Sequence, residues 1–103
     1  MQNYRKKLMY FCKLFLIQHS HSNMLEYSLK DEIKILFNDN EMVLSILYRG
    51  QIIIQLYYNK TKNKRTFGSS GIVGNELFSI PCNDDNILKQ VCKILDATNF
   101  VEY

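Results

Sequence analysis

The residues best suited to nucleophilic or metal chemistry are the two histidines of His19-Ser20-His21, which follow a long apolar stretch. Two imidazoles at positions i and i+2 point in different directions on a helix, and no acidic or cysteine ligand lies close to them in the sequence. Cysteine or serine catalysis would need a histidine to meet its nucleophile across the fold, for example His19 with Cys82 or Ser69. The sequence contains neither an elbow motif nor an orienting acid. We therefore predict no catalytic residue, no metal site and a protein that is not an enzyme.

Glycines between residues 68 and 74 form the second group of residues that could bind a ligand. A phosphate-binding P-loop needs a Lys-Ser or Lys-Thr pair after its last glycine, but Asn75 and Glu76 follow Gly74. Gly68-Ser69-Ser70-Gly71 also has the spacing of loops that clamp a nucleic-acid backbone between two helices. Here the flanking residues predict strand or irregular structure instead. We expect a surface loop and no cofactor.

The cysteines indicate the compartment. They are three in number and none forms a C-x-x-C pair, so neither a disulfide framework nor a zinc site is indicated. Cys12 and Cys92 fall among apolar residues of predicted helices, where free cysteine packs as a small hydrophobe. A reducing, cytoplasmic location is predicted. Export is the alternative, because Arg5-Lys6-Lys7 followed by Leu8–Ile17 resembles a secretory signal, although Lys13 interrupts the apolar stretch.

Basic side chains gather in two islands, residues 5–13 and residues 60–65, on a chain whose other segments are weakly acidic. Two such islands could contact nucleic acid, a membrane surface or an acidic protein. The second island lies beside Tyr57, Tyr58 and Phe67, and basic residues next to aromatic ones can hold phosphates while stacking bases. A solvated loop is the alternative. The candidate anion-binding residues are Lys60, Lys62, Lys64 and Arg65.

Length and composition predict one domain over residues 1–103. The chain has 103 residues, of which 47% are hydrophobic and 22% charged, as is ordinary for a globular protein. No run approaches 18 uncharged apolar residues, so no membrane span is predicted. Asparagine, lysine and isoleucine are over-represented; their AT-rich codons indicate a low-GC genome rather than a function.

Hydrophobic periodicity predicts an α+β fold with an N-terminal helix, an antiparallel meander sheet of about four to five strands and a C-terminal helix. Short polar turns between the strands favour a meander over parallel crossovers. Asn83 or Asp84 is the expected N-cap of the second helix. Residues 59–65 are expected to form a basic loop. The predicted elements are a helix over 3–18, strands over 24–30, 33–37, 42–48, 51–58 and 77–80, and a helix from 84 to about 99.

Two segments carry more apolar surface than a small domain needs. The first helix has one stripe of apolar residues at helical spacing and a second apolar region on its far side. Strands 42–48 and 51–58 are apolar on both faces; in the latter, alternation places Ile52, Ile54 and Leu56 on one side. Surplus apolar surface commonly marks an interaction site. The candidate partner-binding residues are Met9, Tyr10, Leu14, Ile17 and Tyr57.

By exclusion, the leading hypothesis is a small protein-binding module that acts by steric occlusion. Toxin immunity proteins (antitoxins) and phage-type inhibitors are small α+β proteins of this kind. The expected partner is another protein, a toxin or an enzyme, and self-association is the other possibility. A nucleic-acid-binding protein using residues 5–13 and 60–65 is the second hypothesis. A structural subunit of a larger assembly is the third.

Overall fold

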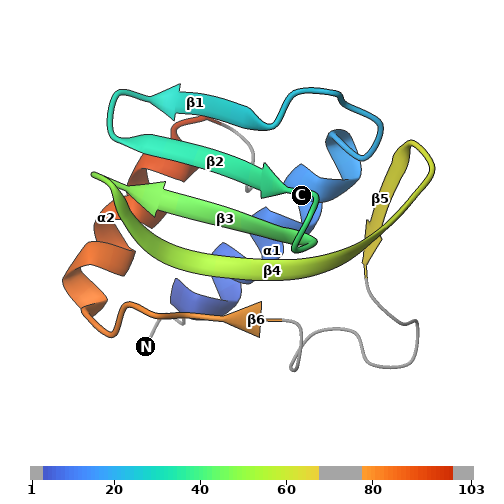
Figure 1. Cartoon of the computed structure of the whole chain (residues 1–103). Coiled ribbons are helices and arrows are strands. Elements are labelled where there is room, and N and C mark those ends of the chain that lie inside the picture. The colour runs from blue at the N-terminus through green and yellow to red at the C-terminus, as the bar shows by residue number, and fades with distance from the viewer. Residues whose placement is uncertain (1–3, 68–77, 99–103) are drawn as a thin grey trace.

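The computed structural model describes residues 4–67 and 78–98 and confirms the α+β architecture (Figure 1). A helix precedes an antiparallel sheet and a second helix follows it. The elements are α1 (Tyr4–Gln18), β1 (Glu26–Lys30), β2 (Ile33–Asn38), β3 (Val43–Tyr48), β4 (Gln51–Thr61), β5 (Lys64–Phe67), β6 (Phe78–Ser79) and α2 (Asp85–Asp96).

The sheet is the predicted meander, with strand order β1-β2-β3-β4-β5 and every pairing antiparallel. The strand β4 is long enough to serve two partners on one edge: its Gln55 and Leu56 pair with β6, and residues 58–61 pair with β5. The prediction of a basic loop over 59–65 is therefore wrong. Those residues form a hairpin, because β4 continues past Tyr58 to Thr61 through exposed polar residues and then pairs with β5. Lys62 and Asn63 form the turn, where Lys62 has a positive φ of 55°.

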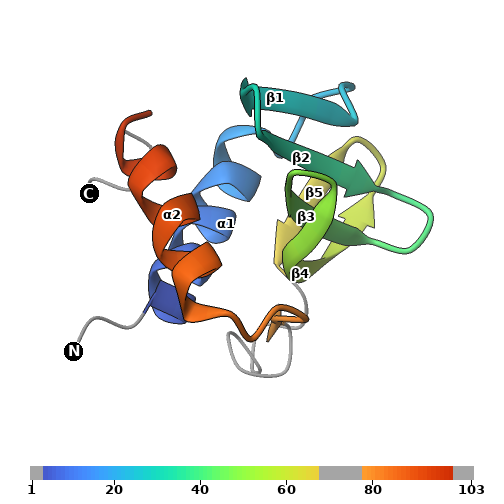
Figure 2. The same cartoon turned by 90° about the vertical axis from the view of Figure 1, so that its left-hand side faces the viewer.

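Both helices lie on one face of the sheet, and the core fills the space between these two layers (Figure 2). The side of α1 that faces the sheet presents a stripe of fully buried apolar residues, as predicted. These are Leu8, Phe11, Cys12, Phe15 and Leu16, and α2 adds Leu88, Val91, Cys92 and Leu95. Within the described residues, neither helix has the length and apolar character that crossing a bilayer requires.

The N-cap of α2 is Asp84, one of the two predicted residues. Its carboxylate accepts hydrogen bonds from the backbone N–H groups of Asn86 (2.9 Å) and Ile87 (3.4 Å). Asp85 follows in the first turn, where a negative charge complements the helix dipole. The start of this helix is thus defined by side chains that sit next to it in the sequence.

Cross-strand register divides the sheet into a covered and an open face. Ile35, Ile46 and Ile54 lie side by side on the face that the helices cover. On the open face, Ser45 is paired with Gln55, whose Nε2 donates a hydrogen bond to the Ser45 hydroxyl (3.2 Å). No described helix packs on that face (Figure 2).

An irregularity in β4 corrects the predicted alternation of that strand. The pairing of β3 with β4 shifts after Ile46, so that Leu47 pairs with Ile52 and Ile53 becomes an extra residue. Such a β-bulge reverses the direction of the side chains that precede it. As a result Ile53 and Ile54 are both buried, whereas Ile52 is 38% exposed on the open face rather than on the side of Ile54.

Candidate functional site

The predicted second apolar region of α1 remains on the outside of the folded protein. Tyr10, Leu14 and Ile17 are spaced i, i+4 and i+7, which places them along one side of the helix. Tyr10 is 41% exposed and Ile17 is 60% exposed, while Leu14 and Met9 are half-buried. We call Tyr10, Leu14 and Ile17 the α1 stripe. It leaves apolar surface in water even though the other side of the same helix already fills the core.

Tyr57, the fifth candidate partner-binding residue, does not join the α1 stripe. Its cross-strand partner is Val43, which puts it on the open face of the sheet, with 41% of its surface exposed. The helices lie behind the opposite face (Figure 2). The structure therefore divides the candidate residues between two surfaces, one on α1 and one on the sheet.

The first basic island is divided as well. On the side of α1 that meets α2, Lys7 Nζ lies 2.6 Å from Asp96 Oδ2, and Arg5 lies 3.7 Å from Asp85. The hydrogen bond to Asp96 raises the pKa of Lys7. Lys13, by contrast, lies next to the α1 stripe, and its ammonium is 6.0 Å from the centre of the Phe67 ring. The island thus serves both to hold the two helices together and to place positive charge beside the stripe.

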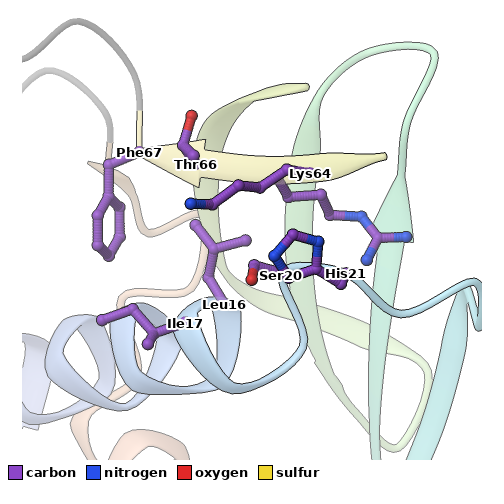
Figure 3. A pocket seen from close by; sticks show the side chains of 8 residues that line it. Leu16, Ile17, Ser20, His21, Lys64, Thr66 and Phe67 are labelled. Carbon is purple, nitrogen blue, oxygen red and sulfur yellow. The ribbon is translucent and has the colours of Figure 1, made fainter. Parts of the chain in front are cut away.

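A pocket of about 290 Å³ opens at the end of the α1 stripe, between the last turn of α1 and β5 (Figure 3). Leu16, Ile17 and Phe67 form its apolar part. Lys64 extends over Leu16 towards Phe67, and His21 stands on the other side (Figure 3). No acidic residue lines it, so the pocket suits an apolar group that is uncharged or carries negative charge. Its full lining is Leu16, Ile17, Ser20, His21, Lys64, Arg65, Thr66 and Phe67.

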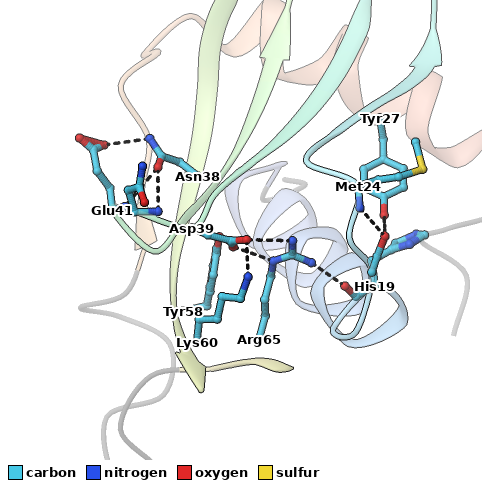
Figure 4. A network of polar contacts seen from close by, with 11 residues as sticks. His19, Met24, Tyr27, Asn38, Asp39, Glu41, Tyr58, Lys60 and Arg65 are labelled. Carbon is cyan, nitrogen blue, oxygen red and sulfur yellow. Dashed lines mark hydrogen bonds and ion pairs between the residues drawn. The ribbon is translucent and has the colours of Figure 1, made fainter. Parts of the chain in front are cut away.

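Beneath this pocket, Arg65 is buried in an ion-pair network, with only 2% of its surface exposed (Figure 4). Its Nε and Nη2 donate to the two carboxylate oxygens of Asp39, at 2.8 and 3.2 Å. Its Nη1 donates to the carbonyl oxygen of His19, just beyond the end of α1, at 2.9 Å. The guanidinium also lies 4.0 Å from the centre of the Phe37 ring. Such a two-pronged arginine–carboxylate pair has a strict geometry.

Asp39 receives two further hydrogen bonds in the same network. The Tyr58 hydroxyl donates to its Oδ1 at 2.6 Å, and Lys60 Nζ donates to its Oδ2 at 2.7 Å. The hydrogen bond from Arg65 is the main reason why the pKa of the Asp39 carboxyl lies well below its usual range. Burial, together with the bond to Asp39, raises the pKa of Tyr58. This network joins the β2–β3 turn, β4, β5 and the end of α1.

The network also changes the interpretation of the second basic island. Arg65 was expected to bind anions from an exposed loop, and that is wrong, because its charge is buried against Asp39. Lys60 is directed to the same carboxylate. Lys62 and Lys64 are exposed and form no ion pair with any residue of the described ranges. The four residues therefore do not form one anion-binding patch.

The two histidines are separated by their surroundings. The His19 ring packs against both Phe15 and Tyr27, with ring centres 4.3 and 4.5 Å away. Burial and, secondly, the charge of Arg65 lower the pKa of His19, which favours the neutral form of its ring. His21 is exposed at the pocket. In residues 4–67 and 78–98 no three His, Cys, Asp or Glu side chains converge as metal ligands would. The glycine segment 68–74, with Ser69, lies outside the described residues.

The three cysteines are free thiols packed in the interior. Burial raises the pKa of Cys12, and it raises the pKa of Cys92 to about 11. Since the thiolate is the reactive form, both thiols stay protonated and inert near neutral pH.

Thiol labelling tests this burial. In native protein at pH 8 we expect Cys12, Cys82 and Cys92 to react with a chromogenic disulfide only as the chain unfolds, and in denaturant at once. The rate of absorbance change with and without urea measures the difference. A thiol that reacts in the native protein as fast as in urea would contradict the packing described here.

The α1 stripe, the adjoining pocket and the open sheet face are thus among the surfaces of the described residues that remain available to a partner. None of them contains an arrangement of groups that is specific to one known chemistry. Comparison with known proteins adds no relative: no family model matches the chain, and neither a curated protein nor a solved structure matches it.

Proposed function

We propose that this protein works by binding another protein, with the α1 stripe at the centre of the contact. The observation that supports this is the exposure of Tyr10 and Ile17 on a helix whose opposite side is completely buried. Apolar residues at i, i+4 and i+7 are the pattern by which one helix packs against a partner. Leaving such a stripe in water has no benefit for the stability of the isolated domain.

The charges around the α1 stripe indicate which kind of partner surface would fit it. The helix α1 contains no acidic residue, and Lys13 lies one turn before Ile17, beside the stripe. The pocket at its end has Lys64 at the rim and no carboxylate in its lining. The partner surface that fits is an apolar ridge flanked by acidic side chains, with one apolar side chain in the pocket. The lysines would accelerate and orient the encounter, and the apolar residues would supply affinity.

The proposed mode of action is steric occlusion, in the cytoplasm, of a toxin or an enzyme, as an immunity protein or phage-type inhibitor would act. Occlusion requires no reactive group, and buried, protonated thiols are compatible with a reducing compartment. A permanent subunit of a larger assembly would use the same stripe. Nucleic-acid binding has less support, because Arg65 and Lys60 are occupied by Asp39.

Site-specific photocrosslinking in the cells that make this protein tests the proposal. A photoreactive phenylalanine analogue at Ile17, or at Tyr10, should give an adduct with one and the same protein. Tyr10→Ala should reduce formation of the Ile17 adduct, because truncating an aromatic anchor typically costs about 2 kcal/mol, roughly 30-fold in affinity.

The matched control is the same analogue at Lys89, an exposed position of α2. No discrete adduct is expected there. The proposal is overturned if Ile17 and Lys89 give the same adducts, or if the Ile17 adduct is a nucleic acid that disappears on nuclease treatment. Thermal melting of each variant shows whether the fold has survived.

A further inference from the structure

The strand β1 has one edge without a partner strand. Among the described strands it pairs only with β2, and it forms the outer edge of the sheet (Figure 1). Along its five residues, exposed and half-buried side chains alternate: Glu26, Ser28 and Lys30 are exposed, and Tyr27 and Leu29 are half-buried. An edge of this kind presents backbone N–H and C=O groups that can pair with a strand of another chain.

The backbone groups that point outward can be identified. Phe37 N–H donates to the Leu25 carbonyl (2.8 Å), and the register pairs Tyr27 with Ile35 two residues further along. In an antiparallel ladder, hydrogen-bonded and non-hydrogen-bonded pairs alternate. Leu25 and Tyr27 therefore bond towards β2, whereas the N–H and C=O groups of Glu26 and Ser28 point away from it, towards the free edge.

The sequence of β1 is complementary to itself when read in the opposite direction. If two copies pair in antiparallel fashion about Ser28, Glu26 of each copy lies opposite Lys30 of the other. Opposite charges face each other twice, on the exposed side of the joined sheet. The outward backbone groups of Ser28 then bond to those of its own counterpart. We infer that β1 is a self-association edge, through which two copies of this chain form a two-fold dimer with one continuous sheet.

Side chains on the covered side of the sheet agree with this register. The same pairing places Tyr27 opposite Leu29 of the second copy, twice. Both side chains pack against the core yet stay partly exposed at the edge, and an aromatic–aliphatic cross-strand pair would bury them. Among the residues that the structure describes, Glu26 has one ion-pair contact, a long one of 3.8 Å to Lys34 between two exposed side chains, which is compatible with pairing to Lys30 of a second copy.

Edge strands are often protected by charges or bulges that prevent pairing, and β1 contains both. A register shift with β2 falls between Ser28 and Lys30. Protection by charge, however, works best with charges of one sign, since these repel any copy of the same strand. Here the two ends carry opposite signs, and repulsion arises only in the parallel orientation. The charges thus select the antiparallel dimer rather than prevent it.

Charge-swap variants of the full chain test the inference, with sedimentation velocity as the measurement. Glu26→Lys and Lys30→Glu should each weaken self-association by at least about tenfold, because two attractive cross-strand pairs become repulsive. Mixing the two variants should restore assembly as a heterodimer, and so should the double variant Glu26→Lys with Lys30→Glu. Asp31→Asn, next to the strand, is the neutral control.

A second variant tests the backbone part of the inference. Ser28→Pro removes an N–H that points outward, so the pairing with β2 loses no hydrogen bond and the thermal melt should change little. Dimer formation should be abolished. The inference is overturned if the native chain is monomeric at all concentrations, or if the dimer is indifferent to both charge swaps and to Ser28→Pro. Crosslinking of Ile17 to a different protein is a separate measurement. The self-association inference and the proposed function can therefore each be contradicted without the other.

Discussion

Asp39→Asn should lower the free energy of unfolding by about 3–5 kcal/mol, the effect expected when one partner of a buried ion pair is removed. Within the described residues, the carboxylate of Asp39 is the only negative charge in contact with the buried guanidinium of Arg65. An amide can accept one of these hydrogen bonds but cannot neutralise the charge. Urea unfolding followed by circular dichroism measures the loss.

Two further variants separate the ion pair from a general effect of substitution. Asp31→Asn removes an exposed carboxylate and should change stability by less than about 0.5 kcal/mol. Adding Arg65→Met to Asp39→Asn removes the unpaired buried charge and should recover part of the loss. Equal stability of the Asp39 and Asp31 variants would show that Arg65 is not held as described.

The same pair gives a pH dependence with a definite sign. Because the pKa of Asp39 is lowered in the folded state, its contribution to stability is complete above the unfolded-state pKa of about 4. It is lost as the pH falls below that value towards the folded-state pKa. The native protein should therefore lose stability in acid more steeply than the Asp39→Asn variant, and melting curves between neutral and acidic pH measure both slopes.

Ile54→Ala should destabilise the fold by about 2–5 kcal/mol. Ile54 is fully buried at the centre of the sheet, opposite Ile46 and beneath the helices. Removing three carbon atoms there leaves a cavity that the neighbouring strands cannot close. Urea unfolding is again the measurement, with the slope of the transition checking that unfolding remains cooperative.

The matched control comes from the same strand. Ile52 is the same residue type two positions earlier, but the bulge at Ile53 turns it to the open face. We expect Ile52→Ala to cost less than about 1 kcal/mol, in proportion to its smaller loss of buried surface. Losses of similar size at both positions would contradict the register described for β4, or show that a partner covers the open face.

Local signals in the sequence were sufficient for most of the fold. The buried stripe of α1, the alternation in β2 and the Asp84 N-cap each depend on residues that are close together in the sequence. The bulge at Ile53 could not be predicted in this way, since Ile52, Ile53 and Ile54 are chemically identical. Which of them faces the core is decided by the pairing with β3.

Prediction of the candidate site was limited for a similar reason. The exposure of Tyr10 and Ile17 followed from the helical pattern, because a helix with two apolar sides cannot bury both against one sheet. The burial of Arg65 did not follow from any local pattern. Its partner Asp39 is 26 residues earlier in the chain. The neighbouring lysines predict an exposed Arg65 instead.

The helix α1 is held by polar contacts at both ends. At its N-terminal end Arg5 and Lys7 form ion pairs with α2, and just beyond its C-terminal end the His19 carbonyl accepts a hydrogen bond from Arg65. If the α1 stripe is the contact surface proposed above, it is pre-organised, because the helix that carries it is already held in place before a partner arrives. Association of a pre-organised surface loses little conformational entropy. Affinities of related complexes then differ mainly through their dissociation rates. Under the proposed function, removing the contact between Arg65 and the His19 carbonyl is therefore expected to reduce the affinity for the partner, although no side chain of the α1 stripe is changed.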